Sequence, residues 1–293
     1  MRLVVLHNPA SGRGNGAGRL RTILHALAAA GHEMIQYGVA PHLRPGGLRD
    51  RLKHADALIV AGGDGSVHHA TPDAIATGIP LYHLPFGTEN LFAREFGMSD
   101  RVDDLLEALR RFIIRTIDAA DCNGRTFVIM AGIGFDAAVV GRVSRHRRGG
   151  VTRAAYVRHA VEEVRQWRVP TVTICADGRE IVRDQPGQLI VANLRSYAAG
   201  LNPATDADPT DGLLDVVFLP CRTRAGLAQR LIAVAAGTHA DHASVVRARA
   251  RTIRVDCRSG APHLQLDGES VGNSPSVLDL EIKRASLRIL RPA

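Results

Sequence analysis

The sequence predicts an α/β domain with a mainly parallel sheet, followed by a larger antiparallel β-sandwich, with an active-site cleft between the two. Three observations lead to this fold class. Apolar strand-like runs alternate with helical stretches up to about residue 118, strand-like runs with few helices dominate after it, and no low-complexity linker separates the two patterns. We therefore expect domains at residues 1–118 and 119–293, with the last few residues able to return to the first domain.

The N-terminal region alternates between predicted strands and predicted helices. A helix is expected at 16–30, where apolar side chains recur at helical spacing (Leu20, Ile23, Leu24 and Leu27), and another near 47–54. A helix is also expected to restart at Pro72, because Thr71 before it is a good cap and proline fits the first helical position. The expected strands are 2–7, 33–39, 57–61 and 81–84.

A hairpin is the clearest feature of the C-terminal region. Residues 171–176 alternate in polarity, Asp177-Gly178 is a strong turn signal, and 179–183 form the return strand. Further strands are expected at 126–131, 189–193, 214–219, 252–257, 263–266, 276–282 and 287–290, and helices near 153–167 and 224–236. So many strands with so few helices indicate an antiparallel sandwich.

Composition excludes several classes of protein. Of the 293 residues, 45% are hydrophobic and 23% charged, so the chain can bury a core and is not disordered. The net charge is +8, but only 4% of residues are aromatic and no nucleic-acid-reading motif is present, so we expect no nucleic-acid partner. The four cysteines lie far apart, and neither an 18-residue apolar run nor a signal-peptide core occurs, which predicts a cytoplasmic protein.

Glycine-rich segments follow three of the predicted strands. They are residues 8–14, 62–66 and 87–90, and the carboxyl ends of parallel strands share one edge of a sheet. Glycines let the backbone approach phosphate oxygens, and a helix N-terminus after the turn attracts negative charge. The alternative is that the glycines only make tight turns. No acidic residue ends the second strand and no Gly-Lys-Ser/Thr occurs, so neither the dinucleotide fingerprint nor a P-loop explains them.

Six motifs together resemble one known family. They are Asn8-Pro9-Ala10-Ser11-Gly12, Gly62-Gly63-Asp64-Gly65-Ser66, Pro85-Phe86-Gly87-Thr88-Glu89-Asn90, Gly132-Ile133-Gly134-Phe135-Asp136, Asp211-Gly212-Leu213-Leu214-Asp215 and Asp267-Gly268-Glu269. Their order resembles that of diacylglycerol-kinase-type lipid kinases, which include bacterial soluble lipid kinases and the sphingosine and ceramide kinases. The resemblance covers residues 2 to 290.

The resemblance implies roles for individual residues. The nucleotide phosphates would be surrounded by Asn8, Pro9, Ala10, Ser11, Gly12, Gly62, Gly63, Asp64, Gly65, Ser66, Val67 and His68, with Thr88 and Asn90 completing the floor. Asp64 would lie by the metal-bound phosphates, and Glu269 would be the general base. A magnesium site would use the Asp211 side chain with the main-chain oxygens of Asp208 and Leu213, which are hard ligands suited to Mg²⁺.

Each acidic residue also has a purely structural interpretation. Asp211-Gly212 reads as a turn before a strand, and Asp267-Gly268 as a hairpin turn that leaves Glu269 an exposed strand residue. Asp64 differs, because a carboxylate between glycines at the ligand edge of a sheet has no obvious packing task.

A basic segment lies between Arg142 and Arg168. It contains eight arginines and only two acidic residues, Glu162 and Glu163. Its apolar residues Val157, Val161, Val164 and Trp167 recur at helical spacing and form a stripe. One interpretation is a solvated helix packed on the sandwich. The other is an interfacial element that holds the protein against anionic lipid.

The leading functional hypothesis is an ATP-dependent lipid kinase that uses Mg²⁺ and phosphorylates a lipid hydroxyl, with diacylglycerol or a related lipid as acceptor. Such a chain would meet its lipid substrate peripherally and transiently at a membrane surface. The sequence does not decide whether the chain forms a homodimer. The alternatives are an NAD kinase, disfavoured because no Gly-x-Leu-Gly-Phe run occurs mid-chain, and a catalytically silent lipid- or nucleotide-binding regulator.

Overall fold

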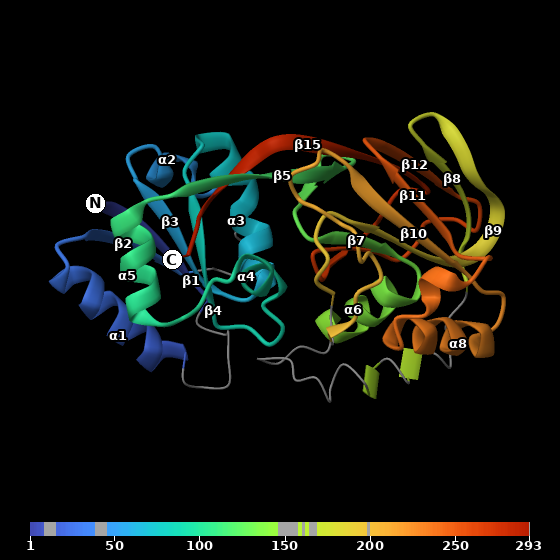
Figure 1. The fold of residues 1–293 in the computed structure, drawn as a ribbon, viewed down its shortest axis with the longest axis horizontal. Coiled ribbons are helices and arrows are strands. Elements are labelled where there is room, and N and C mark those ends of the chain that lie inside the picture. The colour runs from blue at the N-terminus through green and yellow to red at the C-terminus, as the bar shows by residue number, and fades with distance from the viewer. Residues whose placement is uncertain are drawn as a thin grey trace. The chain divides into compact units, whose positions relative to one another are not determined.

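The computed structural model describes residues 1–8, 16–38, 46–145, 158–159, 162–163, 169–197 and 200–292. These residues form two compact units (Figure 1). The first unit comprises 1–117 and 285–292, and the second comprises the described residues of 118–284. The chain leaves the first unit within β5 (Ile114–Cys122) and returns to it within β15 (Val277–Leu290).

The first unit is built on a parallel sheet. Its strands are β1 (Arg2–His7), β2 (Glu33–Gly38), β3 (Ala57–Gly62) and β4 (Leu81–Pro85), in the order β2-β1-β3-β4, and the end of β15 pairs in parallel with β4. All six residues of β3 are buried. A strand buried on both faces is typical of a sheet covered by helices on both sides, as the uninterrupted apolar run predicted.

Helices connect the strands of the first unit. They are α1 (Gly16–Ala29), α2 (Arg49–Leu52), α3 (Asp64–Thr77), α4 (Leu91–Phe96) and α5 (Val102–Arg111). Helix α1 packs beside α5, whereas α3 packs against β3, α2 and α4. The predicted restart at Pro72 is wrong: α3 runs through this proline without a break, and the Thr71 hydroxyl donates back to Val67 O at 2.8 Å rather than capping a new helix.

The second unit is a β-sandwich of two mainly antiparallel layers. One layer contains β5, β6 (Arg125–Phe127), β8 (Thr171–Ala176), β12 (Thr252–Cys257) and the first part of β15. The other contains β7 (Met130–Ile133), β10 (Leu214–Pro220), β11 (Val246–Ala250), β13 (Leu264–Leu266) and β14 (Glu269–Val271). Strand β9 (Arg179–Ala192) belongs to both, since its first half pairs with β8 and its second half with β7 and β10.

Apolar side chains from both layers form the core of the sandwich. Ile174 of β8 and Val255 of β12 meet Val191 of β9 and Val216 of β10 in one buried cluster. Helix α6 (Phe135–Arg145) and helix α8 (Arg224–Ala235) contribute a smaller cluster around Phe135 and Leu227. A short 3₁₀ turn, His239–Asp241, follows α8.

Several predicted elements of the second unit have different bounds in the structure. The single strand expected at 126–131 is two strands, because the backbone N–H groups of residues 128–130 turn to the Asp267 carboxylate. The strands expected at 179–183 and 189–193 are one strand. The strand continues through Pro186-Gly187. Glycine here lets the backbone approach the Phe218 ring, since a Cβ at Gly187 would lie 2.4 Å from Phe218 Cζ.

Other differences have equally local causes. The strands expected at 276–282 and 287–290 are also one strand, in which the exposed residues Lys283, Arg284 and Ala285 interrupt the apolar pattern. Helices α4, α5 and α6 and strands β5, β11 and β14 were not predicted. The helix expected at 153–167 falls almost entirely outside the described residues. Within the part of the chain that the structure describes, no helix is long and apolar enough to cross a membrane.

Candidate functional site

The glycine turn after β3 leads directly into a helix. Gly63 is the N-cap of α3 with extended backbone, and its carbonyl accepts from the N–H groups of Ser66 and Val67. A Cβ at Gly62 would lie 2.3 Å from Ser66 Oγ, so this position requires glycine. The first turn of a 14-residue helix therefore begins at the carboxyl edge of the sheet, where its N–H groups and its dipole attract anions.

A second glycine turn, after β4, touches the first. A Cβ at Gly87 would lie 2.6 Å from Gly63 Cα, so the two backbones meet without any intervening side chain. Asn90 closes this second turn: its Oδ1 accepts from Gly87 N at 2.8 Å, and its Nδ2 donates to Gly87 O at 2.9 Å. The structure thus brings residues 62–66 and 87–90 together, as the position of both turns at one sheet edge predicted.

Asp64 has a structural task that the sequence did not reveal. Its Oδ1 accepts from Phe92 N at 3.0 Å, which ties the first residue of α3 to the first turn of α4. The expectation that this carboxylate has no packing role is therefore wrong. The residue remains partly exposed at the start of α3, where its charge lies beside both glycine turns.

His83 is a buried residue of this region that the sequence analysis missed. It is fully buried on β4, and its Nε2 lies 3.0 Å from the Gly62 carbonyl, to which the protonated nitrogen donates. Its Nδ1 has no hydrogen-bond partner among the described residues. Burial lowers the pKa of His83, outweighing the nearby Asp64 charge and the bond to Gly62, so the imidazole is neutral. A histidine within an otherwise apolar strand was the available signal.

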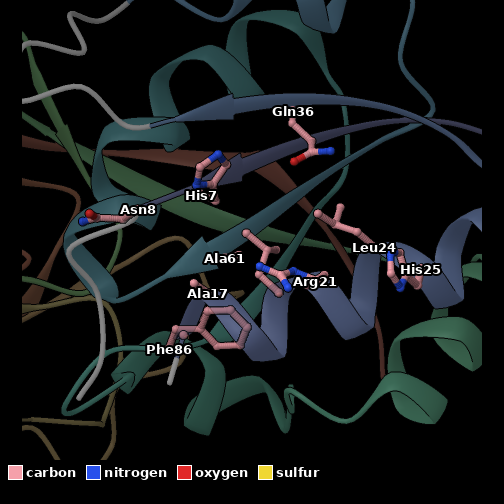
Figure 2. A pocket seen from close by; sticks show the side chains of 11 residues that line it. His7, Asn8, Ala17, Arg21, Leu24, His25, Gln36, Ala61 and Phe86 are labelled. Atoms are coloured by element: carbon pink, nitrogen blue, oxygen red, sulfur yellow. The ribbon is translucent and has the colours of Figure 1, made fainter. Parts of the chain in front are cut away.

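A cavity of about 480 Å³ opens beside these turns (Figure 2). His7 and Asn8 at the end of β1, Ala61 of β3, Gln36 of β2 and Phe86 line one part, and helix α1 supplies the rest, including Arg21 and His25. The Arg19 guanidinium lies 4.9 Å from the centre of the Phe86 ring. The cavity combines an apolar wall with polar groups, as small-molecule sites do.

The remaining residues predicted to bind the nucleotide differ in how exposed they are. Ser66 is buried and its Oγ has no hydrogen-bond partner among the described residues, whereas Thr88 is exposed. Val67 is fully buried, so only its backbone can face a ligand, while Gly65 and His68 are partly exposed. Pro9, Ala10, Ser11 and Gly12 lie outside the described residues; Asn8 before them donates its N–H to Ala61 O at 3.0 Å.

In the second unit, the Asp267-Gly268 turn joins β13 to β14. Leu266 pairs with Glu269 across it, so the hairpin interpretation is correct for the backbone. The buried Asp267 carboxylate is more than a turn residue, because it accepts from the N–H groups of Val128, Ile129 and Met130 at 2.7–3.2 Å. A carboxylate held by three backbone donors fixes this turn to the segment between β6 and β7.

Side chains also hold the turn from its other side. Gln265 Oε1 accepts from Gly268 N at 2.7 Å, and Gln265 Nε2 donates to Asp136 Oδ2 at 2.9 Å. A Cβ at Gly132 would lie 2.3 Å from Asp136 Oδ2, so glycine makes room for this pair. Burial raises the pKa of Asp136, against the hydrogen bonds from Tyr197 and Gln265. Glu269 is the first residue of β14 and is partly exposed, with its backbone placed by this network.

Asp208, Asp211 and Leu213 lie in the turn before β10, as the turn interpretation expected. Asp211 Oδ1 accepts from Leu213 N at 2.8 Å, and its Oδ2 contacts the Arg249 guanidinium. The Asp208 carbonyl accepts from Asp211 N at 3.4 Å. Among the described residues, no group of three or more His, Cys, Asp or Glu side chains is arranged to hold a metal ion. Both Asp211 oxygens are engaged and one of them contacts a guanidinium, so the charge of this carboxylate is compensated by the chain itself.

Comparison with known proteins agrees with this architecture. Residues 2–122 match the diacylglycerol kinase catalytic domain, and residues 129–291 match the YegS C-terminal NAD kinase beta sandwich-like domain. A diacylglycerol kinase of Mycobacterium tuberculosis is 30% identical, covering 99% of this chain and 95% of its own length. A probable YegS-like lipid kinase of Pseudomonas aeruginosa is 28% identical, covering 99% and 94%.

Solved structures share the fold. A diacylglycerol kinase structure from Bacillus anthracis superposes with a TM-score of 0.76 at 19% identity, covering 99% of this chain and 96% of the other. Yeast NADH kinase gives a TM-score of 0.57 at 10% identity, covering 100% and 84%. The two matched domain models, the near-complete coverage of the relatives and the fold of both units lead to one conclusion: the chain belongs to the diacylglycerol-kinase-type family of lipid kinases.

Proposed function

We propose that this chain is an ATP-dependent lipid kinase that transfers the γ-phosphoryl group of MgATP to the hydroxyl of diacylglycerol or a related lipid. The observation that carries the proposal is the meeting of two glycine turns at the start of α3, where Gly63 and Gly87 approach backbone to backbone. Glycine at these positions lets a ligand approach the backbone at a helix N-terminus, which suits a polyphosphate.

The cavity beside β1 and β3 would hold the rest of the nucleotide. It adjoins the turns, since its lining residues Ala61 and Phe86 directly precede Gly62 and Gly87. Arg21, His7 and His25 favour an anionic ligand, and Gln36 offers both a donor and an acceptor. Asn8 together with Pro9, Ala10, Ser11 and Gly12 would close the phosphate site, as the resemblance implied.

Glu269 would act as general base in the transfer. Its carboxylate would take the proton of the lipid hydroxyl as the hydroxyl oxygen bonds to the γ-phosphorus, and the bond from the γ-phosphorus to its bridging oxygen would break to release ADP. The Asp267 and Gln265 contacts support this role, because they fix the backbone from which the Glu269 side chain extends.

Magnesium would arrive with ATP as part of the substrate, neutralising the phosphate charge during transfer. Asp64 would face that metal, since it starts α3 beside both glycine turns and its Oδ1 is held by Phe92 N.

The acceptor lipid requires access to a membrane surface, so we also propose a transient peripheral association in the cytoplasm. Of the basic segment, Arg142 and Arg158 have described side chains; Arg142 Nε bonds Glu163 Oε2 at 2.7 Å, and Arg158 lies 4.0 Å from Glu162. The largely buried Arg142–Glu163 pair favours a packed helix for that part, whereas the Arg158–Glu162 pair faces solvent. Arg147, Arg148, Arg153, Arg165, Arg168 and the apolar stripe (Val157, Val161, Val164 and Trp167) lie outside the described residues.

A second candidate, NAD kinase activity, is suggested by the fold likeness to yeast NADH kinase. It would use the same phosphate site with a nucleotide hydroxyl as acceptor. The sequence lacks the Gly-x-Leu-Gly-Phe run expected of that activity.

Incubation with γ-labelled ATP and Mg²⁺ tests both candidates. Parallel reactions would contain diacylglycerol micelles, a total lipid extract or NAD. We expect label in the organic phase as phosphatidic acid or a related phospholipid. Label on NAD alone would establish the second candidate, and nucleotide binding without transfer to any acceptor would identify a silent regulator.

A further inference from the structure

The acidic segment 204–213, which precedes β10, is held by arginines. Its carboxylates are those of Asp206, Asp208 and Asp211, and Asp215 follows on β10 itself. Ala204 and Ala207 anchor the segment in a buried cluster with Val217 and Leu219. Carboxylates gathered in one short segment repel one another, and a cation placed among them lowers that repulsion.

Arg249 supplies positive charge at the centre of the segment. It lies on β11 directly opposite Asp215 of β10, and its Nε is 3.7 Å from Asp215 Oδ1. Its terminal nitrogen contacts Asp211 Oδ2, so one guanidinium bridges two carboxylates. The Asp211 side chain is only 23% exposed and that of Asp215 only 8%, which reduces screening by solvent.

Two further arginines hold the flank of the same segment. Arg247, two residues earlier on β11, bonds Asp206 Oδ2 at 2.5 Å. Arg195 Nε donates to the Ala207 carbonyl at 3.0 Å. Both a side-chain oxygen and a main-chain oxygen are therefore met by guanidinium groups, which is the task a divalent cation would perform there.

A magnesium ion and Arg249 would compete for the negative charge of Asp211. Mg²⁺ demands about six oxygens in near-octahedral geometry at roughly 2.0–2.1 Å. A guanidinium on Asp211 Oδ2 places a permanent positive charge beside any ion on this carboxylate, and that repulsion disfavours a bound divalent cation.

We propose that Arg249 serves as a built-in cation that holds the segment 204–213, so that the folding of this segment needs no resident divalent ion. The proposal concerns only this segment and is independent of the magnesium that accompanies ATP.

Thermal unfolding of the nucleotide-free protein tests the proposal. The full chain is melted in millimolar MgCl₂ and in EDTA, with the transition followed by circular dichroism. We expect the two Tm values to agree within about 1 °C, since a ligand stabilises only a fold that binds it. A Tm several degrees higher in magnesium would overturn the proposal, because it would reveal a resident ion.

Arg249→Gln sharpens the test. Removing the guanidinium leaves Asp211 and Asp215 facing each other, so Tm in EDTA should fall by about 2–4 °C and magnesium should recover part of the loss. Arg254→Gln is the matched control, because this strand arginine pairs with Asp279, outside segment 204–213; it should gain no magnesium response.

Two outcomes with the variants would contradict the proposal. One is an Arg249→Gln protein with unchanged Tm, and the other is one that loses stability but shows no magnesium response. Arg249→Lys keeps the test usable if Arg249→Gln does not fold, because lysine retains the positive charge. This variant should melt near the wild-type temperature and stay insensitive to magnesium.

Discussion

The two turns that would carry chemistry are built in opposite ways. In the first unit, Gly62, Gly63 and Gly87 shape the site by lacking side chains, since a Cβ at any of them would lie within 3.2 Å of a neighbouring atom. In the second unit, the Asp267 carboxylate shapes the turn by filling it and accepting from three backbone N–H groups.

The difference fits the roles proposed for the two turns. A phosphate site would need backbone that a ligand can approach, which glycines at a helix N-terminus provide. A general base would need one side chain in a fixed place, which a backbone immobilised by hydrogen bonds would provide. Substitutions should therefore affect the two turns differently.

The largest expected loss of stability is at the acidic turn. Asp267→Ala leaves three buried N–H groups without an acceptor and should lower the free energy of unfolding by about 3–5 kcal/mol, as measured by urea titration. Asp267→Asn, which keeps one carbonyl oxygen, should lose less. Glu269→Gln in the same turn is the control and should change stability by less than about 0.5 kcal/mol. Equal losses for Asp267→Ala and Glu269→Gln would contradict the account of this turn.

The glycine turns should show a smaller but specific loss. Gly87→Ala forces a Cβ against Gly63 Cα, which should cost about 1–3 kcal/mol and weaken ATP binding by roughly tenfold, measured by calorimetry. Gly18→Ala in α1 is the matched control, because its Cβ meets nothing within 4 Å and alanine favours the helix. Wild-type ATP affinity in Gly87→Ala would show that the two turns do not form the phosphate site.

The smallest effect concerns the pH dependence of stability. Burial lowers the pKa of His83, so between its unfolded value near 6.5 and its lower folded value the unfolded chain binds more protons. The contribution of His83 to the free energy of unfolding is therefore complete above pH 6.5. It falls as the pH drops below this value, by at most about 1.4 kcal/mol per pH unit. His83→Gln keeps a donor for the Gly62 carbonyl but cannot titrate. Urea unfolding at pH 7.5 and pH 5.5 should show a shallower decline for this variant; parallel declines would place the titration elsewhere.

The sequence predicted the elements whose pattern is local. The apolar run of β3, the helical spacing in α1 and the Asp177-Gly178 turn all lie where expected, because periodicity and turn chemistry decide them. It also predicted that the turns after β3 and β4 would meet, since parallel strands end at one edge.

What the sequence did not predict depends on distant partners. Asp267 interrupts the expected strand at 126–131 from more than 130 residues away, and no local pattern encodes that contact. The bond from Phe92 to Asp64 and the contact of His83 with Gly62 likewise join separate segments. The Asp211 contact with Arg249 gave no sequence signal, because the abundance of arginine in this chain makes any single one inconspicuous.

The most direct test of the proposed kinase measures turnover and nucleotide affinity of Glu269→Gln side by side. The account predicts that kcat for lipid phosphorylation falls by about 10²–10⁴, because the hydroxyl loses its base, while the Kd for MgATP changes by less than about twofold. A variant that phosphorylates diacylglycerol at the wild-type rate would contradict the assignment of Glu269 as the base.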